Sequence, residues 1–226
     1  MNPKSLFVTG TDTGVGKTVI SAALTRALVA RGLRVAVMKP IASGSDQTPQ
    51  GLRNSDALTL IAAANVQAPY ETVNPYCFLP PISPHIAAHE AHTPIDFPLV
   101  RSRFHSLATA ADCVIVEGAG GWLAPISPIA TMADLAAALS LPVLLVVGLR
   151  LGCLNHALLT HESLRTRGVT FAGWIANAID PEFARPAENL ATLTARLGEP
   201  PLACVPFLDR DAGTADLSEA AGKLCA

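Results

Sequence analysis

The sequence lacks any block of basic residues, and its formal net charge is only −2 over 226 residues. A protein that binds nucleic acid through phosphates needs a basic patch or stripe, so no nucleic-acid partner is predicted. A long apolar run is missing as well. The longest, around residues 139–149, is interrupted by Ser140, Pro142 and Gly148 and is too short to span a bilayer. We therefore expect no membrane partner.

Cysteine is scarce, and its spacing suggests no cross-link. The cysteines are Cys77, Cys113, Cys153, Cys204 and Cys225. Their count is odd and no CxxC pair occurs, so neither a disulfide framework nor a zinc site is predicted. Cys113 and Cys204 lie in apolar runs and are expected to be small core residues. Residues 1–5 lack the apolar core of a signal peptide, so we expect a cytoplasmic protein.

Metal-binding and hydrolase patterns are also missing. His85, His89, His92 and His105 do not form a convincing ligand set. His85 and His89 share i,i+4 spacing, but nearby prolines disfavour a helix there, so we predict surface histidines and no zinc. The sequence contains neither Gly-x-Ser-x-Gly nor an evident Ser/His/Asp set, so a serine hydrolase is not predicted.

The first apolar run ends in a glycine-rich loop that predicts a phosphate-binding site. Residues 6–8 are typical of a buried strand, and Gly-Thr-Asp-Thr-Gly-Val-Gly-Lys-Thr follows at residues 10–18. In such loops backbone N–H groups face the phosphates, a lysine (here Lys17) reaches the outer phosphates, and a hydroxyl (Thr18) binds magnesium. Thr11 stands where the strict pattern has its first glycine. The alternative is a plain strand–helix turn with an exposed lysine.

The rest of the chain alternates apolar runs with helical segments. This order, with runs that lack period-2 alternation, predicts a mostly parallel sheet buried on both faces. The expected strands cover residues 6–8, 35–38, 113–116, 143–147, 171–176 and 202–205. The expected helices cover residues 19–31, 54–64, 98–110, 131–139, 155–167, 183–197 and 215–224. With the phosphate loop, the predicted fold class is α/β, three-layer and P-loop NTPase-like, in one domain over residues 1–226, with an irregular Pro-rich excursion at 69–98.

Polar residues gather at the predicted carboxyl ends of the strands, where ligands bind in sheets of this type. They are Lys17, Thr18, Lys39, Ser43, Glu117, Asn155 and Asn177. Glu117 directly follows an apolar strand and Asp56 lies in the first turn of a helix, so both are candidate magnesium ligands. The alternatives are a structural ion pair for Glu117 and a helix-terminus charge for Asp56. A surface lysine is the alternative for Lys39, and a simple turn is the alternative for Ser43.

Several stretches, in order along nearly the whole chain, resemble the dethiobiotin synthetase family. They cover residues 8–18, 39–44, 53–57, 73–76, 83–85, 117–122, 151–157 and 173–177. The phosphate loop alone fits many ATPases, but Lys-Pro-x-Ala-Ser-Gly together with Glu-Gly-Ala-Gly-Gly is far more specific. The resemblance implies an ATP- and Mg²⁺-dependent enzyme of biotin synthesis.

The implied substrate is 7,8-diaminononanoate (7,8-diaminopelargonate), together with CO2 or bicarbonate. One amine becomes a carbamate, and ATP phosphorylates it to a carbamic–phosphoric anhydride. The second amine then closes the ring to dethiobiotin, and ADP and phosphate are released. The resemblance further implies a homodimer in which the substrate tail crosses the subunit interface.

The resemblance also implies roles for residues. Lys17 holds the outer phosphates, Lys39 lies between carbamate and γ-phosphate, and Thr13 and Ser43 hydrogen-bond the amine or carbamate. The implied metal ligands are Thr18, Asp56 and Glu117. The implied ATP-binding residues are Gly14, Val15, Gly16, Lys17, Thr18, Val19, Asp56, Glu117, Gly118, Ala119, Gly120, Asn177, Ala178, Pro206, Phe207 and Leu208. The tail carboxylate is expected at a helix start of the partner, at Gly152, Cys153 and Asn155.

This chain departs from some family members at four positions. Gly14 stands where some carry glutamate, and Arg150 stands where some carry lysine, which keeps the charge but changes the geometry. Ala178 stands where some carry aspartate beside the adenine-reading asparagine. Asn189 aligns with a tyrosine that contacts the substrate tail in some members, so no tail contact is assigned to it.

Two other functions compete with this one. An amidoligase-type relative that phosphorylates a carboxylate of a corrin-like substrate would carry a glutaminase-like domain, which we do not expect after the last helix. A partitioning ATPase usually has an extra lysine early in the phosphate loop, and residues 11–13 contain none. Residues 215–226 also show no amphipathic membrane tail. The ring-closing synthetase is therefore the favoured hypothesis.

Overall fold

The computed structural model describes residues 5–208 and 215–225. In this part of the chain, six parallel strands form the main sheet in the order β10-β9-β8-β1-β7-β2. They are β1 (Leu6–Gly10), β2 (Val35–Met38), β7 (Cys113–Glu117), β8 (Val143–Leu149), β9 (Phe171–Ala178) and β10 (Ala203–Val205). The α/β prediction is therefore confirmed. The expected domain boundaries include residues 1–4, 209–214 and 226, which lie outside the described residues.

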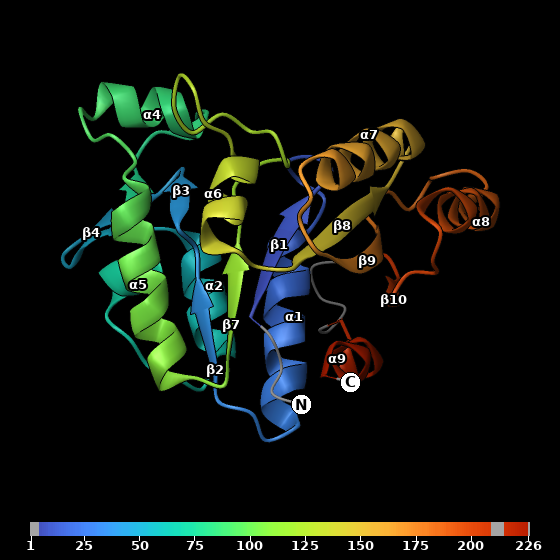
Figure 1. The fold of residues 1–226 in the computed structure, drawn as a ribbon, viewed down its shortest axis with the longest axis horizontal. Helices are drawn as coiled ribbons and strands as arrows, with labels where there is room; N and C mark the ends of the chain where they lie inside the picture. The colour runs from blue at the N-terminus through green and yellow to red at the C-terminus, as the bar shows by residue number, and fades with distance from the viewer. Residues whose placement is uncertain (1–4, 209–214, 226) are drawn as a thin grey trace.

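Helices cover both faces of this sheet (Figure 1). On one face lie α1 (Lys17–Ala30), α2 (Ser55–Ala63) and α9 (Ser218–Cys225). On the other lie α5 (Phe97–Ala110), α6 (Met132–Leu139), α7 (Cys153–Thr166) and α8 (Pro186–Leu197). None of the described helices is both long enough and apolar enough to cross a membrane.

The strands lack polar alternation because both of their faces are buried. In β1, Leu6 and Val8 pack in the cluster formed with α1, α2 and α9, whereas Phe7 packs in the cluster formed with α5 and α6. Successive side chains of a strand point to opposite faces, so every position of β1 meets a helix layer. Fully burying one such side chain stabilises the fold by roughly 1.5–3 kcal/mol.

The segment expected to be irregular contains three short elements. They are α3 (Tyr70–Val73), β6 (Tyr76–Phe78), which pairs with β3 (Ile41–Ser43), and α4 (Pro84–Glu90). The expectation that nearby prolines disfavour a helix at His85 and His89 is wrong, because Pro84 occupies the first turn of α4, where no backbone N–H is needed. A hairpin of β4 (Asp46–Thr48) and β5 (Gly51–Arg53) was also not predicted.

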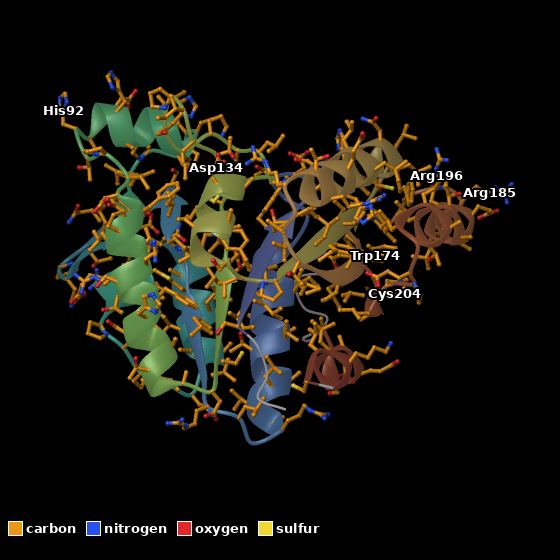
Figure 2. All side chains as sticks on the ribbon, in the orientation of Figure 1. His92, Asp134, Trp174, Arg185, Arg196 and Cys204 are labelled. Atoms are coloured by element: carbon orange, nitrogen blue, oxygen red, sulfur yellow. The ribbon has the colours of Figure 1, made fainter. Side chains whose placement is uncertain are left out.

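Other differences concern burial and element ends. Cys113 is buried as predicted, but Cys204 is exposed, because it lies on the short edge strand β10 (Figure 2). His89, His92 and His105 are exposed, as predicted, whereas His85 is half-buried and its Nδ1 is covered. His92 lies just beyond α4 (Figure 2). Element ends differ from the expected ones by a few residues, and α7 starts at Cys153 instead of residue 155.

Candidate active site

The glycine-rich loop lies between β1 and α1, at the carboxyl end of the sheet. Gly14 and Gly16 have φ values of +75° and +86°, a backbone region that other residues rarely adopt. A Cβ atom at Gly16 would also lie only 2.2 Å from Nδ2 of Asn177. Helix α1 begins at the next residue, so its positive N-terminal end faces the loop. The loop thus has the backbone of an anion-binding site.

A cleft of about 910 Å³ opens beside this loop. It is bounded by the loop, residues 39–43 at the ends of β2 and β3, the start of α2, residues 81–86 at the start of α4, and residues 117–125. The sequence-predicted residues among its lining are Thr13, Gly14, Gly16, Lys17, Thr18, Val19, Lys39, Ser43, Asp56, Glu117, Ala119 and Gly120. Val15 and Gly118 are buried behind this lining. The structure therefore gathers residues from five separate segments in one cleft.

Lys39 is the centre of an ionic cluster in this cleft. Its Nζ donates to Oδ2 of Asp56 at 2.9 Å and to Oε1 of Glu117 at 2.5 Å, and the Thr18 hydroxyl donates to the same Oε1 at 2.8 Å. Met38 pairs with Val116 in neighbouring strands, so the residues that follow them are brought side by side. Lys39 is 4% exposed and Glu117 is fully buried.

Burial and charge set the protonation states here. Burial opposes the charged form of Lys39, but the Glu117 and Asp56 carboxylates raise its pKa above the ordinary value. Burial likewise opposes ionisation of Asp56, yet Lys39 and the Thr18 hydroxyl hold its pKa below the ordinary value. Burial, reinforced by the charge of Lys39, lowers the pKa of Lys17 to about 8. Lys39 is thus an ammonium group at neutral pH.

Two buried oxygens in the cleft have no hydrogen-bond partner among the described residues. They are Oε2 of Glu117 and Oγ of Ser43. Leaving a buried polar atom unpaired costs about 1–3 kcal/mol, so such atoms indicate where a ligand would bind. The nearby Thr18 hydroxyl and Asp56 carboxylate complete a set of hard oxygen donors, which is the set that Mg²⁺ prefers. These residues therefore fit a magnesium ion.

Asp12 links several parts of the phosphate loop by hydrogen bonds, a role that its position in the sequence did not predict. Its backbone carbonyl accepts from Nζ of Lys17 at 3.0 Å, and its Oδ1 accepts from the Thr13 N–H at 2.7 Å. Its Oδ2 accepts from the guanidinium of Arg150, which follows β8. The only sequence signal was an acidic residue in the loop and a cation at a strand end.

The residues expected around adenine lie at the carboxyl ends of β9 and β10 and are not among those that line the cleft. Asn177 is paired with Val205 in the sheet, so the ends of β9 and β10 are adjacent. Nδ2 of Asn177 donates to the carbonyl of Val15 in the phosphate loop at 2.9 Å. Ala178 and Leu208 are half-buried, whereas Pro206 and Phe207 are exposed. Asn177 therefore also supports the loop, which the sequence did not predict.

The residues expected to receive the substrate tail lie at the start of α7. Gly152 caps the helix with φ of +94°, and Asn155 is exposed. Cys153 is 2% exposed, and its N–H already donates to the carbonyl of Arg150 at 3.0 Å. Its thiol lies in the core, so this side chain does not face the surface at the helix start. None of these three residues lines the described cleft of the same chain.

Comparison with known proteins gives the family. A family model described as an AAA domain matches residues 4–212. ATP-dependent dethiobiotin synthetase BioD 1 of Escherichia coli (strain K12) is 50% identical over 205 residues, which is 91% of each chain. The BioD protein of Pseudomonas aeruginosa (strain UCBPP-PA14) is 49% identical over 210 residues, covering 91% of this chain and 90% of that protein.

Solved structures show the same fold at low sequence identity. The MinD cell division protein of Aquifex aeolicus superposes with a TM-score of 0.61 at 15% identity, covering 98% of this chain and 96% of that one. A ParA family ATPase from Chlorobium tepidum TLS gives 0.56 at 17% identity, covering 100% and 90%. These P-loop NTPases support the fold alone. Because about half of the aligned residues are identical over nine-tenths of its length, this chain belongs to the ATP-dependent dethiobiotin synthetase family.

Proposed function

We propose that this protein is an ATP-dependent dethiobiotin synthetase. It would convert 7,8-diaminononanoate, CO2 and ATP into dethiobiotin, ADP and phosphate, a step of biotin biosynthesis. The observation that carries the proposal is the cluster of Lys39, Asp56, Glu117 and Thr18 in one cleft with the phosphate loop. Phosphoryl transfer between two anions needs concentrated positive charge of this kind.

The phosphate loop would bind the triphosphate of ATP. The N-terminal end of α1 and the backbone N–H groups around Gly14 and Gly16 favour an anion, and Lys17 adds a charge that reaches the outer phosphates. The pKa of Lys17, lowered to about 8, rises again when phosphates approach, because their charge favours the ammonium form. Asn177 would read the adenine edge, with Ala178, Pro206, Phe207 and Leu208 around the base.

Lys39 would act between the two reacting anions. The carbamate oxygen attacks the γ-phosphorus of ATP, and the bond to the β-phosphate oxygen breaks, releasing ADP. The ammonium group of Lys39 would offset the repulsion between carbamate and phosphate. The second amine then attacks the carbamate carbon, the C–O bond to phosphate breaks, and the amine proton is lost. The raised pKa of Lys39 suits a cation that stabilises charge and not a general base.

Thr18, Asp56 and Glu117 would hold Mg²⁺, and this assignment is supported by Oε2 of Glu117, which has no partner within residues 5–208 and 215–225. A bound magnesium ion supplies charge neutralisation on the phosphates. Glu117 therefore has two tasks, since Oε1 already accepts from Lys39 and Thr18.

The diamine would lie along the opposite wall of the cleft. Ser43 has a buried hydroxyl without a partner among the described residues, so it can donate to the carbamate or accept from an amine. Thr13 is exposed at the mouth of the loop and would contact the same groups. The tail carboxylate would reach the start of α7, at Gly152, Cys153 and Asn155, in a second subunit. The active form would therefore be a homodimer. We further propose that each subunit is a single domain and that the enzyme is cytoplasmic.

The test is synthesis by the purified protein. The protein is incubated with the diamine, bicarbonate, Mg²⁺ and ATP, and dethiobiotin is detected by mass spectrometry. The expected result is one ADP for each dethiobiotin formed, with no product when either diamine or bicarbonate is omitted. Turnover of ATP that does not depend on the diamine, with no dethiobiotin, would overturn the proposal and favour a partitioning-type ATPase.

A further inference from the structure

Behind the cleft, the Tyr70 hydroxyl joins the residue that precedes α2 to the stretch of residues 70–77, which runs from α3 into β6. Its hydroxyl accepts from the backbone N–H of Asn54 at 2.7 Å and lies 2.9 Å from Oδ1 of Asn74, to which it donates. It also lies 3.6 Å from Sγ of Cys77. Tyr70 does not line the described cleft, so it does not meet a ligand there.

Asn74 connects the Tyr70 hydroxyl to the backbone of Lys39 through hydrogen bonds. Its Nδ2 donates to the Lys39 carbonyl at 2.7 Å and to the Tyr76 carbonyl at 3.2 Å. The two carbonyl acceptors fix the amide orientation, so Oδ1 must face the Tyr70 hydroxyl. The N–H of Lys39 in turn donates to the carbonyl of Val73 at 2.9 Å, next to Asn74. Both backbone polar groups of Lys39 are therefore held by α3 and the residue that follows it.

Asn54 connects the Tyr70 hydroxyl to the first turn of α2, which contains Asp56, and to Gly44, the residue after Ser43. Its side chain caps α2 by accepting from the N–H of Ala57 at 3.2 Å, which sets the first turn containing Asp56. Its Nδ2 donates to the carbonyl of Gly44 at 3.2 Å, directly after Ser43. Asn54 and Asn74 are 4% and 2% exposed, so water cannot easily replace these bonds.

We propose that Tyr70 is a positioning residue of the active site: its hydroxyl fixes Lys39 through Asn74, and Asp56 and Ser43 through Asn54. The proposal rests on the proposed function for the meaning of those three residues. Lys39, Asp56 and Ser43 lie on different segments, and the Tyr70 hydroxyl is one hydrogen bond from each side of the network. A shift of about 1 Å in such groups can cost on the order of 100-fold in rate.

Two observations explain why a tyrosine suits this position. The guanidinium of Arg53 lies 4.1 Å from the centre of the Tyr70 ring, which holds the ring by a cation–π contact. Burial raises the pKa of the phenol, so the hydroxyl keeps the proton that it donates to Asn74. A phenylalanine would keep the ring and its contact with Arg53 and lose only the hydroxyl.

The experiment compares Tyr70→Phe with Tyr76→Phe, a matched control. The Tyr76 hydroxyl also accepts from a backbone N–H at 2.7 Å, but that N–H belongs to Asp96 at the start of α5. Both variants leave one backbone donor unpaired; Tyr70→Phe also leaves Oδ1 of the buried Asn74 without its donor, so unfolding is measured for both and kcat is compared at a temperature where both are folded. Tyr70→Phe should lower kcat for dethiobiotin about 10- to 100-fold and raise the Mg²⁺ concentration for half-maximal nucleotide binding, with KM for ATP changed less than kcat. Tyr76→Phe should leave kcat within about twofold.

Asn74→Ala provides a second, independent variant. If Tyr70 acts on Lys39 through Asn74, the loss of kcat in the double variant is smaller than the product of the two single losses, because both substitutions break the bond between the Tyr70 hydroxyl and Asn74. Equal kcat and equal Mg²⁺ titrations for the two tyrosine variants would overturn the positioning role, and so would additive losses in the double variant. Nucleotide binding by calorimetry needs no turnover. If the wild-type protein makes no dethiobiotin, but Tyr70→Phe still raises the Mg²⁺ concentration needed for nucleotide binding, the proposed function is refuted and the positioning role is retained.

Discussion

The ammonium group of Lys39 and the carboxylate of Glu117 form a buried ion pair at the adjacent ends of two parallel strands. The pair unites the proposed catalytic cation with a proposed metal ligand. Removing one partner of a buried pair leaves the other charge without compensation, which costs about 3–5 kcal/mol. Experiments on either residue must therefore measure stability together with activity.

Replacement of Lys39 by alanine should lower kcat by at least about 100-fold, because the charge between the two reacting anions is lost. The affinity for ATP should change little, since Lys17 and the phosphate loop remain. Steady-state kinetics and nucleotide calorimetry, at a temperature where the variant is folded, check this. Lys223→Ala, which removes an exposed lysine paired with Glu219, is the control. A fully active Lys39→Ala protein would exclude Lys39 from the chemistry.

Replacement of Glu117 by glutamine should raise the Mg²⁺ concentration for half-maximal activity about tenfold or more. The amide keeps the size of the side chain but removes the charge that attracts the ion. The measurement is a magnesium titration at saturating ATP, with Glu219→Gln as the control for loss of a surface carboxylate. An unchanged titration would reduce Glu117 to a structural ion pair with Lys39.

The order of strands and helices and most of the site were predictable from the sequence, for a physical reason. Parallel strands buried on both faces appear as apolar runs, and their carboxyl ends meet along one edge. Lys39, Glu117 and Lys17 each follow such a run, so their proximity follows from topology. The helix cap at Asn54 was also predictable, because asparagine before a helix accepts from the first turn.

What the sequence could not supply are contacts between side chains distant along the chain. Tyr70 and Asn54 are 16 residues apart, and nothing in their local pattern indicates that a phenol accepts a backbone N–H. The structure of the proline-rich stretch could not be predicted either, because Pro84 lies in the first turn of a helix, where proline is tolerated. Cys204 was predicted to be a core residue, but it is exposed, because β10 is an edge strand with a neighbouring strand on one side only.

Replacement of Arg150 should affect catalysis more than stability. Its ion pair with Asp12 is about 40% exposed on both sides, and exposed pairs contribute about 0–1 kcal/mol. Asp12, however, holds Lys17 and Thr13, so Arg150→Met should lower kcat several-fold while the thermal midpoint stays within a few degrees. Arg150→Lys should recover most of the activity. Arg34→Met, which breaks the exposed pair with Asp112, is the control; equal kinetics for both Met variants would contradict this role.

Replacement of Gly16 by alanine should weaken ATP binding at least about tenfold. Gly16 and Gly32 have nearly the same φ, +86° and +85°, so alanine strains both backbones by about 1 kcal/mol. A Cβ at Gly16 would in addition lie 2.2 Å from Asn177, whereas the space around Gly32 is open. Gly32→Ala should therefore lose stability and keep its ATP affinity. Equal ATP affinities for the two variants, measured by calorimetry, would show that the Asn177 side chain can move away from the added methyl group without displacing the loop.

Asp134 should make the stability of the fold depend on pH. It lies in the first turn of α6 (Figure 2), where Oδ2 accepts from the N–H and the hydroxyl of Thr131, each at 2.7 Å, and Oδ1 accepts from Arg167 at 2.7 Å. Burial opposes its ionisation, but these hydrogen bonds hold its pKa below the ordinary value.

A carboxyl whose pKa is lower in the folded state stabilises the fold above the unfolded pKa, about 3.9, and loses this contribution as pH falls through the folded pKa. Asp134→Asn, which resembles the protonated acid, should therefore lower the free energy of unfolding by roughly 1 kcal/mol at pH 7, after allowance for solvent screening. The difference from wild type should shrink below about pH 4. Urea unfolding at pH 7, 5 and 3.5 measures it, with Asp46→Asn on the exposed hairpin as the control. A difference that stays constant across these pH values would show that the carboxylate charge does not stabilise α6.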